Sequence, residues 1–198
     1  MTPVVLASTS SSRMALLKAA GVSFEARSPG VDEAAAKDAL TGEGASPRDV
    51  ADALAELKAL RGARGTSGAL VIGADQTLEL DGALVDKAGS LDEARTRLQA
   101  MRGKAHKLHS GVVVVRDGAP IWREVKSATL WMRPFSDAFL DGYLDREGEA
   151  ILSSVGCYRL EDEGVQLFSR IDGDYFTILG LPMLGLLDLL RLHGALAT

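Results

Sequence analysis

Short apolar runs alternate with amphipathic segments along the chain, and this pattern predicts much of its secondary structure. The run Val4–Ala7 is typical of a buried strand, and residues 14–20 after it have helix-forming character. A second helix is expected from Ser46, an N-cap residue followed by Pro47 at the first helical position. Apolar residues then recur at helical spacing through Leu60.

Strand signals dominate the middle of the chain. Residues 70–73 are apolar and predict a buried strand, with Asp75 falling just beyond its C-terminal end. Residues 78–85 predict a hairpin, because the Asp-Gly pair at their centre suits a type I′ turn. A second Asp-Gly pair joins the apolar segments 108–115 and 121–131, which predicts a longer hairpin.

The remaining segments mix helical and strand patterns. Ser90 and Glu93 have the spacing of a capping box and open a helix that runs to Met101. The later elements are expected to be a helix over residues 136–144, short strands near Tyr158 and over 166–171, a turn at Gly173-Asp174, and a last helix over 182–193. No repeat or linker divides the chain, so the pattern predicts one domain, residues 1–198, of the α/β or α+β class with a mixed sheet.

Composition and charge exclude several classes of protein. The chain has 198 residues and a formal net charge of −5, which disfavours sequence-independent binding to a nucleic-acid backbone. Cys157 is the only cysteine, so no intrachain disulfide forms, which fits a reducing compartment. The apolar tract from Ile178 to Leu192 is interrupted by Asp188 and Arg191, and the N-terminal segment lacks the basic region of a signal peptide. We therefore expect a cytoplasmic protein that binds neither nucleic acid nor membrane.

Several standard catalytic motifs are absent from the sequence. There is no Walker-type phosphate loop, no G-x-G-x-x-G after the first strand and no G-x-S-x-G elbow. His106 and His109 are three residues apart on an expected strand, so they point to opposite faces, and His193 lies at a helix end. We do not expect these histidines to bind a metal.

A serine-rich segment after the first strand is a candidate anion site. Ser8, Ser10 and Arg13 lie where a strand ends and a helix begins, so hydroxyls, free backbone amides and a guanidinium can converge on phosphate oxygens. The alternative is that a serine caps the helix while Arg13 is solvated, and spacing alone leaves both open.

Acidic and basic residues farther along fit phosphoryl chemistry. Asp32, Glu33 and Asp75 follow apolar segments, and Mg²⁺ sites in such enzymes combine one or two carboxylates with phosphate oxygens. Lys58 and Lys87 can neutralise phosphate charge. The alternatives are acids in turns and lysines in solvent, and the residue types alone leave these open.

Taken in order, these segments resemble the Maf family of nucleoside triphosphate pyrophosphatases from Leu6 almost to Gly194. The matching motifs are Leu6-Ala7-Ser8-x-Ser10-x-x-Arg13, Val31-Asp32-Glu33, Leu54-Ala55-x-x-Lys58-Ala59, Gly73-Ala74-Asp75, Lys87, Gly103-x-x-His106, Gly156-x-Tyr158, and Gly173-Asp174-Tyr175 leading to Gly180-Leu181-Pro182. The resemblance implies an elongated, mixed-sheet α/β fold with a cleft between two lobes, related to inosine triphosphate pyrophosphatases, and often a homodimer.

The resemblance also implies roles for individual residues. The positions that match the triphosphate-binding residues are Ser8, Ser10, Arg13, Lys58 and Lys87. Glu33 matches a carboxylate beside the metal, which is Mg²⁺ or another divalent cation such as Mn²⁺, and Asp75 matches the proton acceptor. Water attacks the α-phosphorus in this reaction, and the metal and the cationic side chains stabilise charge as pyrophosphate leaves. Asp75 serves either as the base or as a second metal ligand, because both roles need an ionised carboxylate near the water.

Ser12, Gln76 and Glu161 match the positions at which the family selects its substrate. Gln76 and Glu161 resemble the branch that hydrolyses 7-methyl-GTP, whereas the branch that prefers dTTP and UTP has threonine and glutamine there. A carboxylate accepts from guanine N1–H and the exocyclic amine, donors that uracil does not present in that arrangement. Ser12 departs from the 7-methyl-GTP branch, which usually has an aromatic residue there to stack on the cationic base. We expect a modified guanine-type substrate, with dTTP or UTP as the alternative.

Other departures from the family lie near the expected cleft. Ser11 stands where proline is usual, Ala88 stands where proline commonly follows the lysine, and Ser153-Ser154 replace an Asp-Lys pair. The main expectation is a house-cleaning hydrolase that removes non-standard nucleotides. The loss of the Asp-Lys charges keeps a second hypothesis open, a nucleotide-binding regulator of septum formation with little turnover.

Overall fold

The computed structural model describes residues 1–197, and a mixed sheet of seven strands lies at its centre. The strands are β1 Val4–Ala7, β2 Glu25–Ala26, β3 Leu70–Leu80, β4 Ala83–Val85, β5 Ala105–Arg116, β6 Ala119–Met132 and β7 Phe168–Asp172. Their order is β2-β1-β3-β5-β6-β7, with β4 paired to β3. β1 pairs in parallel with β2 and β3, and the other pairs are antiparallel. The α/β class with a mixed sheet is confirmed.

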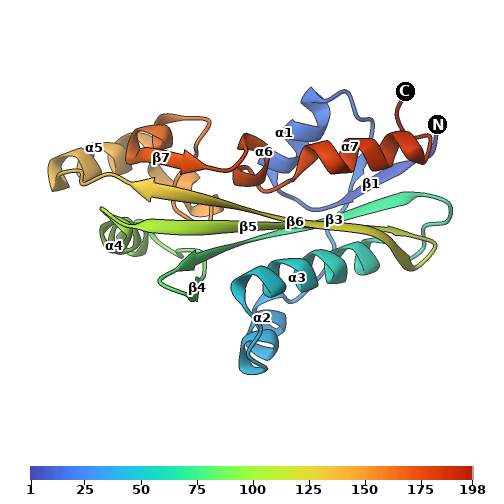
Figure 1. The fold of residues 1–198 in the computed structure, drawn as a ribbon, viewed down its shortest axis with the longest axis horizontal. Helices are drawn as coiled ribbons and strands as arrows, with labels where there is room; N and C mark the ends of the chain where they lie inside the picture. The colour runs from blue at the N-terminus through green and yellow to red at the C-terminus, as the bar shows by residue number, and fades with distance from the viewer. Residues whose placement is uncertain (198) are drawn as a thin grey trace.

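Three long strands, β3, β5 and β6, run along the elongated molecule and belong to both of its lobes (Figure 1). Both predicted hairpins are confirmed, and positive φ angles close each turn. Asp81 and Gly82 have φ of 52° and 83° between β3 and β4, and Asp117 and Gly118 have φ of 49° and 82° between β5 and β6. A type I′ turn needs positive φ at both central residues, which aspartate tolerates and glycine adopts freely.

Helices pack on both faces of the sheet (Figure 1). They are α1 Ser11–Ala19, α2 Glu33–Gly42, α3 Pro47–Gly62, α4 Leu91–Met101, α5 Asp137–Glu147, α6 Tyr175–Ile178 and α7 Met183–Leu192. In one lobe, α3 covers one face while α1 and α7 cover the other, and each face has its own apolar core. A third core lies in the lobe that contains α4 and α5. None of the helices within residues 1–197 has the length and apolar character that crossing a membrane requires.

Polar side chains start the helices where the sequence predicted them to start. The hydroxyls of Ser46, Ser90 and Ser136 each accept a hydrogen bond from the backbone N–H three residues later, which pairs an otherwise free amide of the first turn. At α4 the reciprocal bond of the capping box is shifted by one residue, because Glu93 accepts from the N–H of Gly89 at 2.7 Å.

Three sequence-based expectations about elements are wrong or incomplete. Asp75 does not follow a strand but lies inside β3, which continues to Leu80 because it pairs with β5 along nine residues. Tyr158 is not in a strand; the preceding residue, Cys157, has φ of 57°, which breaks an extended chain. The helix α2, which begins at Glu33, was not anticipated, and it has no buried residue to produce an apolar stripe.

Candidate active site

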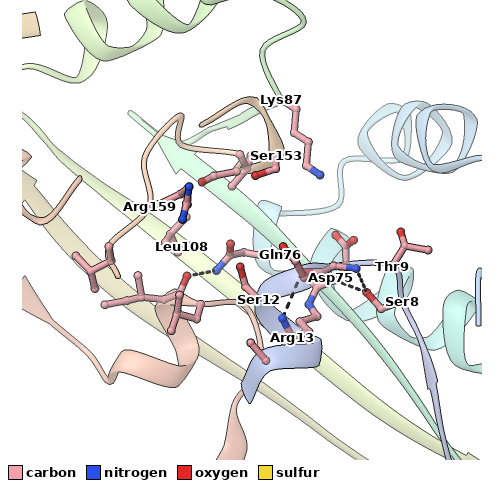
Figure 2. A pocket seen from close by; sticks show the side chains of 18 of the residues that line it. Ser8, Thr9, Ser12, Arg13, Asp75, Gln76, Lys87, Leu108, Ser153 and Arg159 are labelled. Carbon is pink, nitrogen blue, oxygen red and sulfur yellow. Dashed lines mark hydrogen bonds between the residues drawn. The ribbon is translucent and has the colours of Figure 1, made fainter. Parts of the chain in front are cut away.

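A cleft of about 760 Å³ is lined by residues of both lobes, a volume within the usual range for small-molecule sites. Ten residues that the sequence predicted for the site line this cleft: Ser8, Ser10, Ser12, Arg13, Glu33, Lys58, Asp75, Gln76, Lys87 and Glu161. Asp32, the other candidate acid, does not line it and instead caps the start of α2. Figure 2 shows several of them converging from separate elements, with Ser8 and Arg13 beside Asp75 and Lys87 above them. Segments far apart in sequence therefore form one polar surface.

The end of β1 and the start of α1 hold a compact group of donors. The Ser8 hydroxyl accepts from the Ser10 N–H at 3.2 Å and from Arg13 Nη1 at 3.3 Å. Ser10 is the N-cap of α1, and Arg13 Nε donates to the carbonyl of Gly180 at 2.8 Å. Burial lowers the pKa of Arg13, while the nearby Asp75 and Glu33 oppose that shift. An arginine keeps its charge in such a setting, so this corner carries a fixed positive charge beside hydroxyl and backbone donors.

Lys58 lies between two carboxylates at the centre of the cleft. Its Nζ is 2.6 Å from Asp75 Oδ1 and 2.8 Å from Glu33 Oε1. Lys58 and Asp75 are buried, whereas the side chain of Glu33 is half exposed. Asp75 Oδ2 is also buried, and it has no hydrogen-bond partner within residues 1–197. The arrangement leaves one carboxylate oxygen free to accept a proton or to bind a cation.

Two glycines let α3 approach the sheet closely enough to form the Lys58–Asp75 pair. A Cβ on Gly73 would lie 2.2 Å from the carbonyl oxygen of Ala55, and one on Gly111 would lie 2.7 Å from that of Ala51. Gly111 is the β5 partner of Asp75. Gly73 is therefore explained by helix packing, and Asp75, which follows it inside β3, is not an acid in a turn.

Burial and nearby charges shift the pKa values of Glu33 and Lys87, which lie around the Lys58–Asp75 pair. Burial by itself raises the pKa of Glu33, but Lys58, Lys37 and Lys87 more than offset it, so the pKa lies below its ordinary value. Burial lowers the pKa of Lys87, and the positive charges of Arg13 and Lys58 add to that shift. Glu33 is thus held ionised, while Lys87 gives up its proton more easily than a surface lysine.

Gln76, which follows Asp75 on β3, presents a defined polar group to the cleft. Its Nε2 donates to Ser110 Oγ at 3.0 Å, to the Thr177 carbonyl at 3.1 Å and to the Ile178 carbonyl at 2.9 Å. Because the amide hydrogens are used in this way, Gln76 can offer a ligand only the acceptor Oε1.

Glu161 offers a second acceptor in the cleft. It is exposed, and it forms no salt bridge with any residue in the described range 1–197. Ser12 lies in the first turn of α1 and lines the same cleft. Figure 2 places Ser12 beside Gln76 and Asp75, and the three expected selectivity positions, Glu161 included, all line the cleft.

Two cleft residues were missed in the sequence. Lys37 follows Glu33 by one helical turn on α2, and its Nζ lies 2.8 Å from Asp86 Oδ1. An i, i+4 pattern predicts this placement only once α2 is known to be a helix. Arg159 also lines the cleft and pairs with Asp162, but the loop that contains it has no periodic pattern.

The comparison with protein families agrees with this geometry. The model of the family described as Maf-like protein matches residues 3–193. The chain belongs to the Maf family. The resemblance inferred from the ordered motifs is therefore confirmed.

Three bacterial relatives share almost their whole length with this Maf-family chain. It is 68% identical to a nucleoside triphosphate pyrophosphatase of Caulobacter vibrioides over 198 residues, which are 100% of this chain and 99% of the relative. It is 51% identical to a 7-methyl-GTP pyrophosphatase of Rhizobium meliloti, covering 98% and 97% of the two chains. It is 50% identical to a nucleoside triphosphate pyrophosphatase of Granulibacter bethesdensis, covering 98% and 99%.

Proposed function

We propose that this chain hydrolyses a guanine-type nucleoside triphosphate, with 7-methyl-GTP as the first candidate, to the monophosphate and pyrophosphate. The chain is a nucleoside triphosphate pyrophosphatase, a hydrolase of phosphoric anhydrides, in keeping with its family and with the names of its relatives. The choice of base rests on one observation: two acceptors line the cleft, Gln76 Oε1 and the Glu161 carboxylate, and we take them as the base end of the site.

Two acceptors suit guanine better than uracil or thymine. The Watson–Crick edge of guanine has two adjacent donors, N1–H and the exocyclic amine, whereas uracil and thymine have one N–H between two carbonyls. Placing a uracil carbonyl against a carboxylate leaves acceptors facing each other, and each unpaired polar group costs about 1 to 3 kcal/mol. Ser12 supplies no ring to stack on a methylated base, so GTP and 7-methyl-GTP must be compared directly.

Another group of cleft residues suits the triphosphate. Ser8, Ser10 and Arg13 provide hydroxyls, backbone amides and a guanidinium, and Lys87 lies across the cleft from them (Figure 2). Lys58 is bonded to two carboxylates, so most of its charge is already balanced. Arg13 and Lys87 therefore supply the cationic charge that meets the phosphates.

In this proposal, Asp75 accepts the proton of the attacking water. Lys58 holds Oδ1, which leaves the unpaired Oδ2 as the acceptor. As the water oxygen bonds to the α-phosphorus, the bond from that phosphorus to the bridging oxygen breaks, and pyrophosphate leaves with the electron pair. Arg13 and Lys87 stabilise the departing charge.

The donor set also fits Mg²⁺, with Glu33 and Asp75 as its protein ligands. Within residues 1–197 no cluster of three or more histidine, cysteine or acidic side chains can hold a metal, but Mg²⁺ commonly uses one or two carboxylates together with phosphate oxygens and water. The half-exposed Glu33 meets that need, and the unpaired Asp75 Oδ2 joins it in the alternative in which Asp75 binds the metal instead of serving as the base. When bound, the ion would neutralise phosphate charge and orient the substrate.

A triphosphate panel tests the proposal. Pyrophosphate release is measured for GTP, 7-methyl-GTP, UTP and dTTP with Mg²⁺, with Mn²⁺ and with a chelator. We expect release that requires a divalent ion and favours the guanine nucleotides. Glu161→Gln should reduce that preference, while the control Glu163→Gln, whose parent side chain bonds Arg146 at 2.7 Å, should not. A preference for UTP or dTTP overturns the base assignment, and tight binding without release overturns the hydrolase in favour of a regulator.

A further inference from the structure

The segment Ser153–Glu161, here termed the base loop, forms one wall of the cleft and contains Glu161. It has no strand or α-helix of its own after Ser153, where a 3₁₀ helix over Gly148–Ser153 ends. Its own backbone bonds are local turn bonds, such as Ser154 N–H to the Ile151 carbonyl and Cys157 N–H to the Ser154 carbonyl, and such a loop places its side chains accurately only when other groups hold it. Side chains of neighbouring elements must therefore hold the base loop in place.

Three side chains from three different elements reach the base loop. Arg97 Nη1 of α4 donates to the Val155 carbonyl at 3.2 Å, and the Tyr143 hydroxyl of α5 donates to the Cys157 carbonyl at 3.4 Å. The shortest contact comes from the sheet, where His106 Nε2 of β5 lies 2.7 Å from the Tyr158 hydroxyl. This last bond joins His106 and Tyr158, two residues of the family motifs that take no part in the chemical step proposed above.

The His106–Tyr158 bond is buried and neutral. Both residues are at most 3% exposed, and burial lowers the pKa of His106 to about 4, so the imidazole is uncharged at neutral pH. The Tyr158 ring packs edge-on against Phe168, and its centroid lies 5.6 Å from that of His106. The two groups of a buried hydrogen bond in an apolar setting have few alternative partners. The bond therefore restricts the conformation of the loop strongly.

The local backbone couples the position of the Tyr158 ring to the conformation of the base loop. Cys157 has φ of 57°, an uncommon conformation for a residue with a side chain. A Cβ on Gly156 would lie 2.2 Å from Tyr158 Cε1, so the ring folds back directly over the preceding peptide. The bond to His106 holds the ring in this position, and Glu161 follows three residues later.

We propose that His106 is a positioning residue for base selection: acting through the Tyr158 hydroxyl, it fixes the base loop and thereby places Glu161 at the base end of the cleft. The inference rests on the proposed function, because it takes Glu161 as a reader of the base. It predicts that loss of the bond weakens discrimination between bases without weakening the binding of phosphates.

Two variants remove the bond in different ways. Tyr158→Phe keeps the ring and removes the hydroxyl, and His106→Leu removes the imidazole. We expect the guanine-over-uracil ratio of kcat/KM to fall roughly tenfold in both, mainly through KM for the guanine nucleotide. Inhibition by inorganic tripolyphosphate, which has no base, should stay within about twofold of the wild type. His106→Gln, which retains a nitrogen at similar reach, should restore most of the ratio.

The matched control is His109→Leu on the same strand. His109 is also buried, but it faces the other side of the sheet, where it bonds Ser127 Oγ at 2.7 Å and Glu79 Oε2 at 2.9 Å. This variant should lower stability and leave the base ratio unchanged. An unchanged ratio in folded Tyr158→Phe, or an equal loss of tripolyphosphate inhibition, overturns the inference. A wild-type protein that releases no pyrophosphate from any triphosphate overturns the proposed function instead.

Discussion

Lys58 Nζ lies 2.6 Å from Asp75 Oδ1 where the helix α3 crosses the strand β3, and this buried pair organises the candidate site. The same Nζ holds Glu33 at the N-terminal end of α2. The ammonium group of Lys58 thus sets the positions of Asp75 and Glu33, the two carboxylates proposed to act in the reaction. The geometry leaves Asp75 Oδ2 as the unpaired oxygen at the centre of the cleft.

Asp75→Asn should abolish turnover while nucleotide binding is largely kept. The amide is close to the carboxylate in shape but cannot accept the proton of the attacking water, and loss of a general base costs about 10²- to 10⁴-fold. Steady-state pyrophosphate release and equilibrium binding of the same nucleotide measure the two effects. Turnover within about tenfold of the wild type would remove Asp75 from the chemistry.

Gly73→Ala should disrupt the site from a position outside the cleft. The added methyl would lie 2.2 Å from Ala55 O and 2.4 Å from Ala59 N, so α3 must move away from β3. Overpacking of this kind costs about 1 to 3 kcal/mol, and the shift separates Lys58 from Asp75. The free energy of unfolding, measured by chemical denaturation, and the activity should both fall. Gly42→Ala is the control, because its methyl meets nothing within 4 Å.

Lys87 should make substrate binding sensitive to alkaline pH. Its pKa lies below the ordinary 10.5 because of burial and nearby positive charge. As pH rises through that lowered value, the ammonium loses the charge that binds phosphate, so KM should rise at a lower pH than for a surface lysine. Lys87→Arg should delay this rise, since arginine stays charged. Identical KM profiles for the wild type and Lys87→Arg would contradict a phosphate role.

His106 should make stability depend on pH in the acid range. Its pKa is about 4 in the folded protein against 6.5 for an ordinary histidine. The unfolded chain therefore binds a proton between these values that the folded chain does not. Stability is full above about pH 6.5 and falls as pH drops toward 4, by at most about 3 kcal/mol. Urea unfolding at several pH values measures the slope, and His106→Gln should reduce it. A slope of the opposite sign would show that His106 is charged in the fold.

Local chemistry explains which elements could be predicted. Asp-Gly pairs determine the turns at 81–82 and 117–118, because few other residues accept positive φ at both positions. Serine caps and apolar spacing indicate α3, α4 and α5. The ordered motifs also indicated residues that line the cleft. A family preserves the type and order of such residues, so the whole set indicates the site even where a single residue would not.

What the sequence alone determined was therefore most of the longer elements and the identity of most polar residues of the site, because turns, caps and periodicity act over a few residues; α2, which has no buried residue, escaped it. The tertiary structure decided which groups meet. Only the close packing of α3 on Gly73 pairs Lys58 with Asp75, and only the fold places His106 against Tyr158, 52 positions away. Contacts of this kind depend on burial and on sheet register, which no short segment of sequence encodes.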